Sequence, residues 1–294
     1  MTESEQGNSQ FICGMLTLYS PPETYIKNIA TYINYIDKLY VIDNSVNCDN
    51  KIDDELIRKY PKIELLAIGK NIGIAAALNL SIDIALQNRY LWMLTMDQDS
   101  YFDEDQAQRF FHSFSSIGNN DVAILSPSHE KVSVDTGDCI YHKRDTVMTS
   151  GNLLNLSLAK KIGAFNEDLF IDCVDHDYCL RSNLLGIDVL QASNCFIQHE
   201  VGKSFSGSLL YGLRKRTFNI HSPKRMYFIV RNSLCMEKKY SKTFPDYIKG
   251  IKKAMHLKMS KSLRYSNNRI DYMRYILKAY FDFYRNKYGN RVNL

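Results

Sequence analysis

Residues 90–100, YLWMLTMDQDS, decide the fold of this chain more than any other stretch. Residues 90–96 are mostly apolar and too few for a typical helix, so they predict a buried β-strand. The strand ends abruptly at Asp97, Gln98 and Asp99. In an α/β sheet, ligands gather at the carboxyl ends of the strands. This stretch therefore predicts a buried strand with a polar site at its end.

The segments before this strand alternate between two patterns. Short apolar runs that predict strands lie at 11–19, 39–42 and 63–68. Apolar residues at helical spacing predict helices at 23–35, 53–60 and 74–86. Such alternation is typical of the α/β class, with a mostly parallel sheet flanked by helices. Polar clusters follow the first, second and fourth predicted strands, so we expect a site at the edge of the sheet where the carboxyl ends of these strands meet.

The composition is that of a globular protein. The chain has 294 residues, of which 45% are hydrophobic and 23% charged, and these fractions exclude a disordered or collagen-like chain. Its seven cysteines include no Cys-x-x-Cys pair, so we interpret them as reduced thiols of a cytoplasmic protein. No apolar run approaches the ~20 residues of a membrane-spanning helix.

The residue pattern of the sequence changes near residues 205–215. Beyond this point strand-like runs vanish, and Arg, Lys and Tyr recur at helical spacing, so we predict helices to the end of the chain. The expected organisation is a disordered N-terminus over 1–10, a core domain over 11–210 and a basic helical region over 211–294. Residues 1–10 are polar and lack the apolar core of a signal peptide.

Charge is unevenly distributed along the chain. Residues 249–294 contain twelve Lys or Arg against Asp271 and Asp282, a net charge of +10 in a chain whose total is +5. Residues 1–248 therefore carry −5. An acidic body with a basic, aromatic tail indicates an anionic partner for the tail.

Asp97 and Asp99 form the first candidate site. Two carboxylates one residue apart, directly after a buried strand, suit a hard divalent cation such as Mg²⁺ or Mn²⁺ that keeps places for substrate phosphate. The alternative is a strand-ending turn with acidic capping residues.

Residues 70–79, KNIGIAAALN, form the second candidate site. A turn leads here into a helix rich in small residues, and a helix N-terminus favours an anion. The segment contains Gly73 but not the G-x-G-x-x-G pattern, which disfavours a dinucleotide site. Close packing of the alanines on the sheet is the alternative explanation.

The third candidate site is the stretch 170–181, FIDCVDHDYCLR. Ionisable residues at 172, 175, 176 and 177 open a predicted helix. The helix dipole explains one or two of them, but not so dense a group. A carboxylate here suits a general base. Farther along, His199 follows another apolar stretch, where a lone histidine is more often structural than a ligand.

These motifs, taken in order, resemble the inverting glycosyltransferase family 2, which has the GT-A fold. The combination of MDQDS with FIDCVDHDYCLR is closest to the bacterial rhamnosyltransferases that build surface polysaccharides. The resemblance covers about residues 11–205 and returns at Arg231 and Asn232. The motifs that carry it are TLY, VIDNS, KNIGIAAALN, WMLTMDQDS, TSGNLLNLSLAKKIGAF, LFIDCVDHDYCLR, IQHEVG and YFIVRNSL.

The resemblance implies a pocket for the nucleotide of a sugar donor. Thr17, Tyr19 and Asp43 are expected around the base, with Asn71 and Gly73 at its edge.

The resemblance also implies a metal site beside this pocket. Asp99 is expected to hold Mn²⁺ or Mg²⁺ against the donor diphosphate, and His199 matches a histidine that joins the metal in some members. Asp97 is expected near the ribose, and Ser150 and Gly151 in a loop that approaches the sugar.

On the acceptor side, Asp175 falls at the position of the family's catalytic base. Asp177 is expected to shape the acceptor site, and Arg231 to bind the acceptor. Many members have Glu-Asp where this chain has Val174 and Asp175, which leaves the acceptor contacts of those members open.

The function implied is transfer of L-rhamnose from dTDP-rhamnose to a hydroxyl of a growing surface glycan or lipid-linked saccharide, by metal-assisted in-line displacement. A UDP-hexose or galactofuranose transferase of the same fold is the alternative. A nucleotidyltransferase is disfavoured because no glycine-rich loop follows the first strand. The hypothesis of a nucleic-acid-binding protein depends on the basic tail alone, and the acidic residues 1–248 argue against it.

The expected location is the cytoplasmic face of the cell membrane. Residues 249–294 carry basic and aromatic residues that suit an anionic membrane surface. Packing of these helices on the core domain and a homo-oligomer interface are the alternatives.

Overall fold

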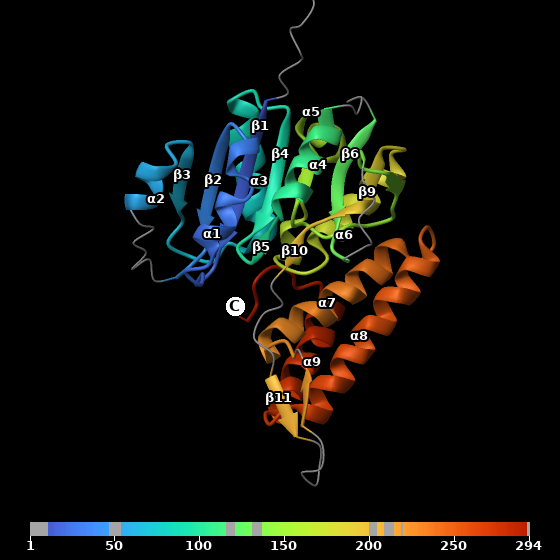
Figure 1. Ribbon diagram of the computed structural model, residues 1–294. Helices are drawn as coiled ribbons and strands as arrows, with labels where there is room; N and C mark the ends of the chain where they lie inside the picture. Colours follow the sequence, from blue (N-terminus) through green and yellow to red (C-terminus); the bar gives the residue numbers. More distant parts are fainter. Residues whose placement is uncertain are drawn as a thin grey trace, which may run out of the picture. The chain divides into compact units, whose positions relative to one another are not determined.

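The computed structural model describes residues 11–46, 54–115, 121–130, 137–199, 205–208, 215–218 and 220–292. The chain forms two compact units (Figure 1). Unit 1 comprises Met1–Phe165 and Tyr178–Glu200, and unit 2 comprises Asn166–Asp177 and Val201–Leu294.

The predicted domain limits compare with these units as follows. The expected disordered segment 1–10 lies outside the described residues, as does most of the expected boundary region 205–215. The short segment 166–177 groups with the C-terminal helices, although it lies inside the predicted domain 11–210. No pattern in the sequence indicates that segment 166–177 belongs to a different unit from the residues on either side of it.

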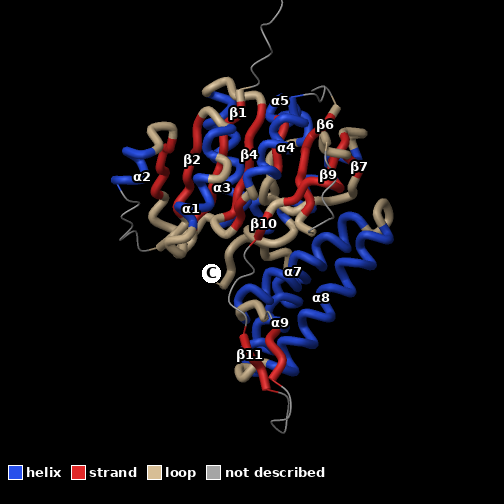
Figure 2. Tube along the Cα trace, viewed as in Figure 1, coloured by secondary structure: helices blue, strands red, loops and turns tan. Residues whose placement is uncertain are grey.

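Unit 1 is built on an eight-stranded sheet with the order β3-β2-β1-β4-β8-β6-β9-β7, whose strands are red in Figure 2. The strands are β1 (Ile12–Leu18), β2 (Lys38–Asp43), β3 (Ile63–Ala67), β4 (Trp92–Asp97), β6 (Val122–Ser128), β7 (Tyr141–Lys143), β8 (Asn152–Asn155) and β9 (Asp188–Phe196). Strands β8 and β7 run antiparallel to their neighbours, and the others share one direction. The prediction of a mostly parallel sheet is confirmed.

Helices flank this sheet (Figure 1). They are α1 (Tyr25–Ala30), α2 (Asp54–Lys59), α3 (Gly73–Gln87), α4 (Glu104–Ser115) and α5 (Leu156–Ile162). The helix predicted over 23–35 is interrupted, because Tyr32 has φ −130° and a short 3₁₀ helix, η1 (Ile33–Tyr35), follows it. Tyr32 and Ile33 are both buried in the core, and this burial outweighs helical continuity.

The chain reverses its direction of travel across the sheet at β1. From β1 it proceeds to β2 and β3 on one side, and it then returns to place β4 on the other side. In open α/β sheets, ligands bind at the carboxyl ends of the strands where the strand order reverses in this way. The fold therefore predicts a ligand-binding crevice at the carboxyl ends of β1 and β4. Asp97 is the last residue of β4, and Gln98 and Asp99 follow it at this point.

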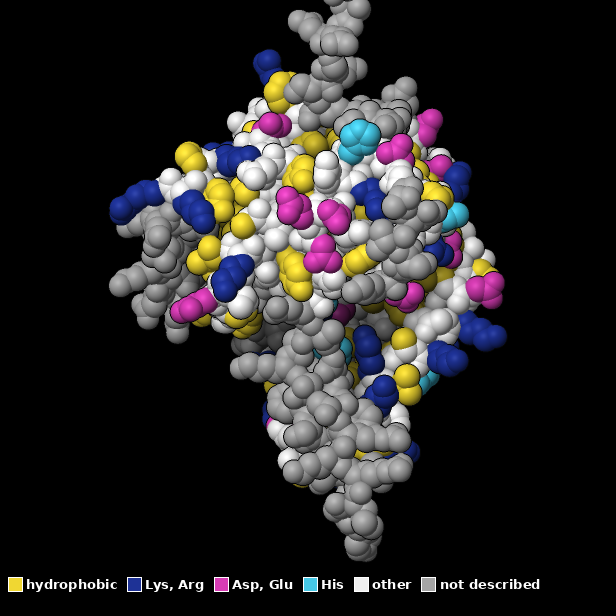
Figure 3. Space-filling model, in the orientation of Figure 1, with side chains coloured by type: hydrophobic (Ala, Val, Ile, Leu, Met, Phe, Trp, Pro, Cys, Tyr) yellow, Lys and Arg dark blue, Asp and Glu magenta, His cyan; other side chains and the backbone are white. Residues whose placement is uncertain are grey.

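Unit 2 contains three long helices that pack on one another: α7 (Pro223–Tyr240), α8 (Pro245–Tyr265) and α9 (Arg269–Tyr284). Their core includes Met226, Val230, Met255 and Ile276. Lys and Arg side chains stand out on the described part of this unit in Figure 3. None of the helices in the described ranges has both the length and the apolar character to cross a membrane.

The prediction of helices alone after residue 211 is wrong at one place. Strand β12 (Lys215–Phe218) pairs antiparallel with β11 (Phe205–Ser208). The sequences KRTF and FSGS lack a run of apolar residues, so backbone pairing forms a ribbon that the apolar pattern does not indicate.

Candidate functional site

The ends of three neighbouring strands bring predicted donor-site residues to one edge of the sheet in unit 1. Thr17 in β1 lies beside Asp97 in β4, and Leu18 lies beside Asp43 in β2. These pairs follow from the parallel register of the three strands. The expectation that the polar clusters share one edge is confirmed.

Asp97, Asp99 and His199 form a cluster at this edge. Each offers one ligand atom, and these atoms lie within 4.8 Å of one another. A two-stranded ribbon brings His199 to the two aspartates. Strand β5 (Ser100–Tyr101) pairs with β10 (Gln198–His199), and this pairing sets His199 opposite Ser100. The Nδ1 atom of His199 lies 3.4 Å from Asp99 Oδ1 and 2.8 Å from Ser100 Oγ.

This cluster has the chemistry of a divalent-cation site. Two carboxylates and an imidazole suit Mn²⁺, and carboxylates with open positions also suit Mg²⁺. The side chains of His199 and Asp99 are 38% and 33% exposed, so substrate has access to them. The residues present therefore fit the cation that the motifs predicted.

Gln98 holds the cluster against β1, a role that the sequence did not indicate. Its Oε1 accepts a hydrogen bond from the Tyr19 amide at 2.8 Å, and its Nε2 donates to the Tyr19 carbonyl at 3.3 Å. The Gln98 carbonyl accepts from Asn28 Nδ2 at 3.0 Å. These bonds fix the turn between the two aspartates. Tyr19 itself is 44% exposed.

Asp43 has a buried carboxylate, and one of its two oxygens has no hydrogen-bond partner among the described residues. Its side chain is 0% exposed, and Oδ1 accepts a hydrogen bond from the Ser45 amide at 2.8 Å. Within the described part of the chain, Oδ2 has no hydrogen-bond partner. A buried acceptor without a partner costs free energy. An N–H group of a ligand would remove that cost.

The start of α3 lies next to the end of β2. Asn44 Nδ2 donates to the Gly73 carbonyl at 3.4 Å, and the Gly73 amide donates to Asn71 Oδ1 at 2.9 Å. Gly73 has φ +83°, which is readily available to glycine but not to other residues. The structure thus places Asn71 and Gly73 in contact with the segment that carries Asp43.

The loop with Ser150 and Gly151 is bonded directly to β4. Ser150 Oγ accepts from the Asp97 amide at 3.0 Å, and the Gly151 amide donates to the Thr95 carbonyl at 2.7 Å. Gly151 has φ +83°, and a Cβ there would lie 2.8 Å from side-chain atoms of Ile197 and Pro127. Glycine is therefore required at 151 by backbone conformation and by packing.

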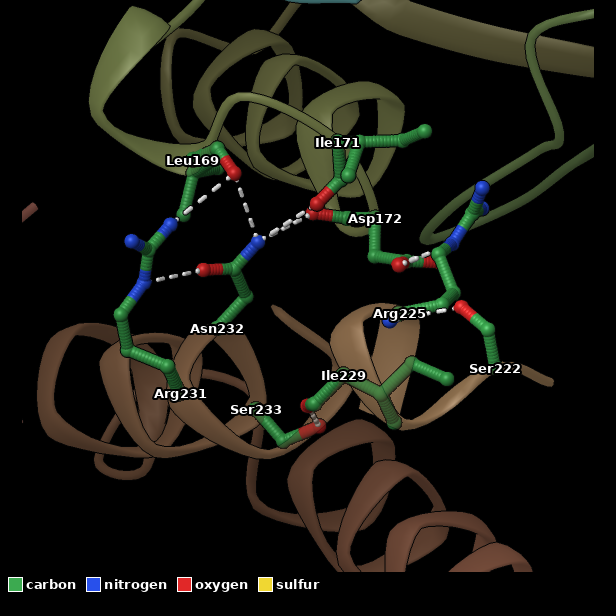
Figure 4. Close-up of polar contacts among 9 residues, drawn as sticks. All are labelled: Leu169, Ile171, Asp172, Ser222, Arg225, Ile229, Arg231, Asn232 and Ser233. Carbon is green, nitrogen blue, oxygen red and sulfur yellow. Dashed lines mark hydrogen bonds and ion pairs between the residues drawn. The ribbon is translucent and has the colours of Figure 1, made fainter. Parts of the chain in front are cut away.

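Unit 2 carries the acidic stretch, at the start of α6 (Val174–Leu184). Asp172 accepts two hydrogen bonds from Arg225, at 2.6 and 2.9 Å (Figure 4). Asp177 is buried, and its Oδ1 accepts from Lys239 Nζ and from Tyr240 Oη, both at 2.7 Å. Two of the three carboxylates are therefore committed to cationic partners.

Asp175 and His176 lie in the first turn of α6. Asp175 is half-buried, and its Oδ1 accepts from the His176 amide at 2.8 Å. The ring Nδ1 of His176 lies 2.7 Å from Tyr247 Oη. Asp175 thus keeps contact with solvent while its side chain is oriented by the first turn of the helix.

The loop before α6 has an unusual backbone. Phe170, Asp172 and Cys173 have φ values of +64°, +67° and +62°, a region that residues other than glycine rarely adopt. Such conformations persist only where surrounding contacts hold them. Asn232 supplies three of these contacts, because its Nδ2 donates to the carbonyls of Leu169, Ile171 and Asp172 at 2.7–2.9 Å (Figure 4).

Arg231 supports the same loop from a fully buried position. Its side chain is 0% exposed, and its guanidinium donates to the carbonyls of Asp168, Leu169 and Gly289. Its Nε donates to Asn232 Oδ1 at 3.0 Å (Figure 4). Through these bonds the fully buried Arg231 holds the loop that leads to Asp175. Binding of the acceptor by Arg231 stays a prediction.

We expect Arg231→Met to destabilise unit 2 strongly. Methionine has a similar length but cannot donate the three hydrogen bonds to the carbonyls of Asp168, Leu169 and Gly289, which contribute ~0.5–1.5 kcal/mol each. The melting temperature should fall by roughly 5–10 °C. Thermal unfolding followed by circular dichroism measures the change. The exposed Arg274→Met serves as the control, and equal melting temperatures for the two variants would contradict the role given to Arg231.

No protein-family model matches the chain. The chain is similar to dTDP-rhamnosyl transferase RfbF of Shigella flexneri, with 26% identity over 256 residues, 78% of this chain and 80% of that protein.

A solved structure with a TM-score above 0.5 has a similar fold. The structure of GalNAc-T7 with UDP, GalNAc and Mn²⁺ matches with a TM-score of 0.58 and 10% identity, over 95% of this chain and 58% of that chain. The chain thus spans a little more than half of GalNAc-T7. A structure of S. aureus TarS matches with a TM-score of 0.48 and 13% identity, over 94% and 73% of the two chains.

The similarities of sequence and of fold lead to the same class of protein. The chain is a glycosyltransferase with the GT-A fold, as its motifs predicted. The curated relative within this class is a rhamnosyltransferase.

Proposed function

We propose that this chain transfers L-rhamnose from dTDP-rhamnose to a hydroxyl group of a saccharide, with the help of a bound divalent cation. The observation that carries the proposal is the cluster of Asp97, Asp99 and His199 at the strand ends. The choice of donor is supported by the relative from Shigella flexneri, a dTDP-rhamnosyl transferase similar over most of both chains.

Asp43 supports a thymine or uracil nucleotide. Its unpartnered, buried Oδ2 is an acceptor, and the imide N–H of either base is a donor of matching chemistry. We place the base beside Asp43, Thr17 and Tyr19, with Asn71 and Gly73 at its edge. The carboxylate of Asp97 then contacts the ribose, and the loop of Ser150 and Gly151 faces the sugar.

We expect Asp43→Asn to weaken dTDP binding by roughly 10- to 100-fold, since a hydrogen bond to a charged group contributes ~1.5–3 kcal/mol. Asparagine keeps the oxygen that the Ser45 amide needs, but it turns a donor toward the imide N–H. Calorimetric titration with dTDP checks this. An N3-methylated dTDP is the matched ligand: it should bind the wild type as weakly as the variant binds dTDP. Equal dTDP affinity for both proteins would remove Asp43 from the site.

The cation would be held by Asp99 and His199, with Asp97 beside it. When bound, Mn²⁺ or Mg²⁺ supplies a Lewis acid for the charge that develops on the leaving diphosphate. Ser100 orients His199 through the bond to its Nδ1. Gln98 keeps the two aspartates in place through its bonds to Tyr19.

We further propose that Asp175 is the general base that accepts the proton of the attacking hydroxyl, which gives inversion at the anomeric carbon. Asp172 is bound by Arg225 and Asp177 by Lys239 and Tyr240. Arg225 donates to both oxygens of Asp172, and Lys239 and Tyr240 both donate to Oδ1 of Asp177. Asp177 then shapes the acceptor site by fixing the first turn of α6.

We propose a lipid-linked saccharide as the acceptor and the cytoplasmic face of the membrane as the place of action. Support comes from the basic residues of 249–294, whose net charge is +10. A lipid carrier keeps its sugar at the membrane surface, and an enzyme attracted to anionic lipid meets it there.

A thermal-shift series with nucleotide sugars tests the proposed donor. A ligand that binds the native state raises the melting temperature. We expect dTDP-rhamnose with Mn²⁺ to give a larger shift than dTDP-rhamnose alone, UDP-glucose or UDP-galactofuranose. A larger shift with a UDP-sugar would replace the proposed donor and leave the transferase class in place.

A further inference from the structure

Helix α9 exposes a continuous apolar stripe, formed by Ile270, Met273, Leu277, Phe281 and Tyr284. These side chains are 81%, 54%, 65%, 51% and 76% exposed. They are three or four residues apart, so they lie on one face of the helix. Contiguous exposed apolar residues on a protein surface mark an interaction site.

The opposite face of α9 already makes the contacts that unit 2 needs. Tyr272, Ile276 and Ala279 are buried in the core with α7 and α8. The buried face of α9 thus packs in the core of unit 2, while more than half of each side chain of the stripe remains exposed. Two apolar faces on one helix, one buried and one exposed, indicate a second binding partner for the exposed face.

Exposed arginines flank the stripe. Arg269, Arg274 and Arg285 are all exposed, and the Arg285 guanidinium lies 3.9 Å from the centroid of the Phe281 ring. Helix α9 has two acidic residues: Asp282 is buried and bound to Lys278 and Tyr227, and Asp271 accepts a hydrogen bond from the neutral Asn268. Three exposed arginines against Asp271 leave the rim of the stripe with a net positive charge.

We propose that this face of α9 docks on an anionic lipid bilayer. Its apolar side chains enter the boundary between headgroups and acyl chains, and its arginines bind lipid phosphates. Arginine matches phosphate geometry with two hydrogen bonds. This inference rests on the proposed membrane location and assigns it to particular residues.

Charge argues for lipid rather than for a second copy of the chain. Symmetric pairing of two α9 faces would bring the arginine-flanked rim of one copy against the same rim of the other, since an isologous interface repeats one surface. Like charges would then be buried together, whereas an anionic membrane neutralises them.

Vesicle flotation of the full chain tests the proposal. We expect binding to phosphatidylcholine vesicles that contain phosphatidylglycerol, weaker binding in high salt, and little binding to phosphatidylcholine alone. The triple variant Met273→Ser, Leu277→Ser and Phe281→Ser should lower the partition coefficient by roughly 10-fold or more. Leu257→Ser on α8 is the matched control, because Leu257 is 53% exposed but lies outside the stripe.

The outcomes separate this inference from the proposed function. Wild-type binding by the triple variant would overturn the assignment to α9. A dimer seen by analytical ultracentrifugation without vesicles, and lost in the triple variant, would assign the stripe to a second copy and overturn it as well. Binding of dTDP reports on the donor site alone. The triple variant should bind dTDP with wild-type affinity. A wild-type protein that does not bind dTDP would count against the proposed function.

Discussion

Asp99→Ala is expected to abolish sugar transfer, with a loss of roughly 10³-fold or more, because a cation that stabilises the leaving diphosphate contributes several kcal/mol. Asp99 lies 3.4 Å from the Nδ1 of His199 and within the cluster completed by Asp97. Alanine removes one of the two proposed ligands and leaves His199, with Asp97 beside it. Donor affinity measured in Mn²⁺ should fall to the value measured with a chelator.

The exposed Asp105→Ala on α4 is the control for loss of one acidic side chain in the same unit. It should leave both transfer and the effect of Mn²⁺ unchanged. Mn²⁺-dependent donor binding that persists in Asp99→Ala would show that the cation is held elsewhere.

Asp175→Asn is expected to lower the transfer rate by about 10²- to 10⁴-fold, the contribution of a general base. The substitution keeps the shape of the side chain and an oxygen for the bond from the His176 amide, so the helix start should be preserved. The Michaelis constant for the donor should stay near the wild-type value, because the base acts on the acceptor hydroxyl. Steady-state kinetics at saturating donor separates the two effects.

Asp172→Asn supplies the comparison within the same loop. It weakens the pair with Arg225 and should lower thermal stability more than Asp175→Asn does, since its carboxylate accepts both bonds from the guanidinium. Near wild-type transfer by Asp175→Asn would place the base at another residue.

The sheet was predictable from the sequence because its strands are short apolar runs. Residues 92–96 of β4 pack their side chains in the core, and Trp92 and Leu94 are 1% and 0% exposed. Polar residues then follow where the strand leaves the core. The parallel register that sets Thr17 beside Asp97 follows from this alternation of strands and helices.

The metal cluster was predictable only in part. The spacing of Asp97 and Asp99 indicated two ligands, but His199 lies about a hundred residues away and entered through the resemblance to known transferases. The β5–β10 ribbon that brings it to the site has two residues in each strand, too few to leave a pattern in the sequence. Such long-range pairing is a property of the tertiary structure.

The supports of the site were not predictable from the sequence. Gln98, Arg231 and Asn232 act through bonds to backbone carbonyls or amides, and a backbone group leaves no signature in the side-chain sequence. Arginine in a helix that also bears exposed charges is ordinarily read as a surface or ligand-binding residue. Its full burial in α7 is set by the loop that it binds.

Release of dTDP from dTDP-rhamnose tests the central claim most directly. The purified chain would be incubated with the donor, Mn²⁺ and a pool of lipid-linked saccharides, with and without a chelator, and beside Asp99→Ala. The account predicts acceptor-dependent release of dTDP with matching gain of rhamnose by the lipid fraction, lost with the chelator and in the variant. Equal release in the presence of the chelator, or from Asp99→Ala, would contradict it.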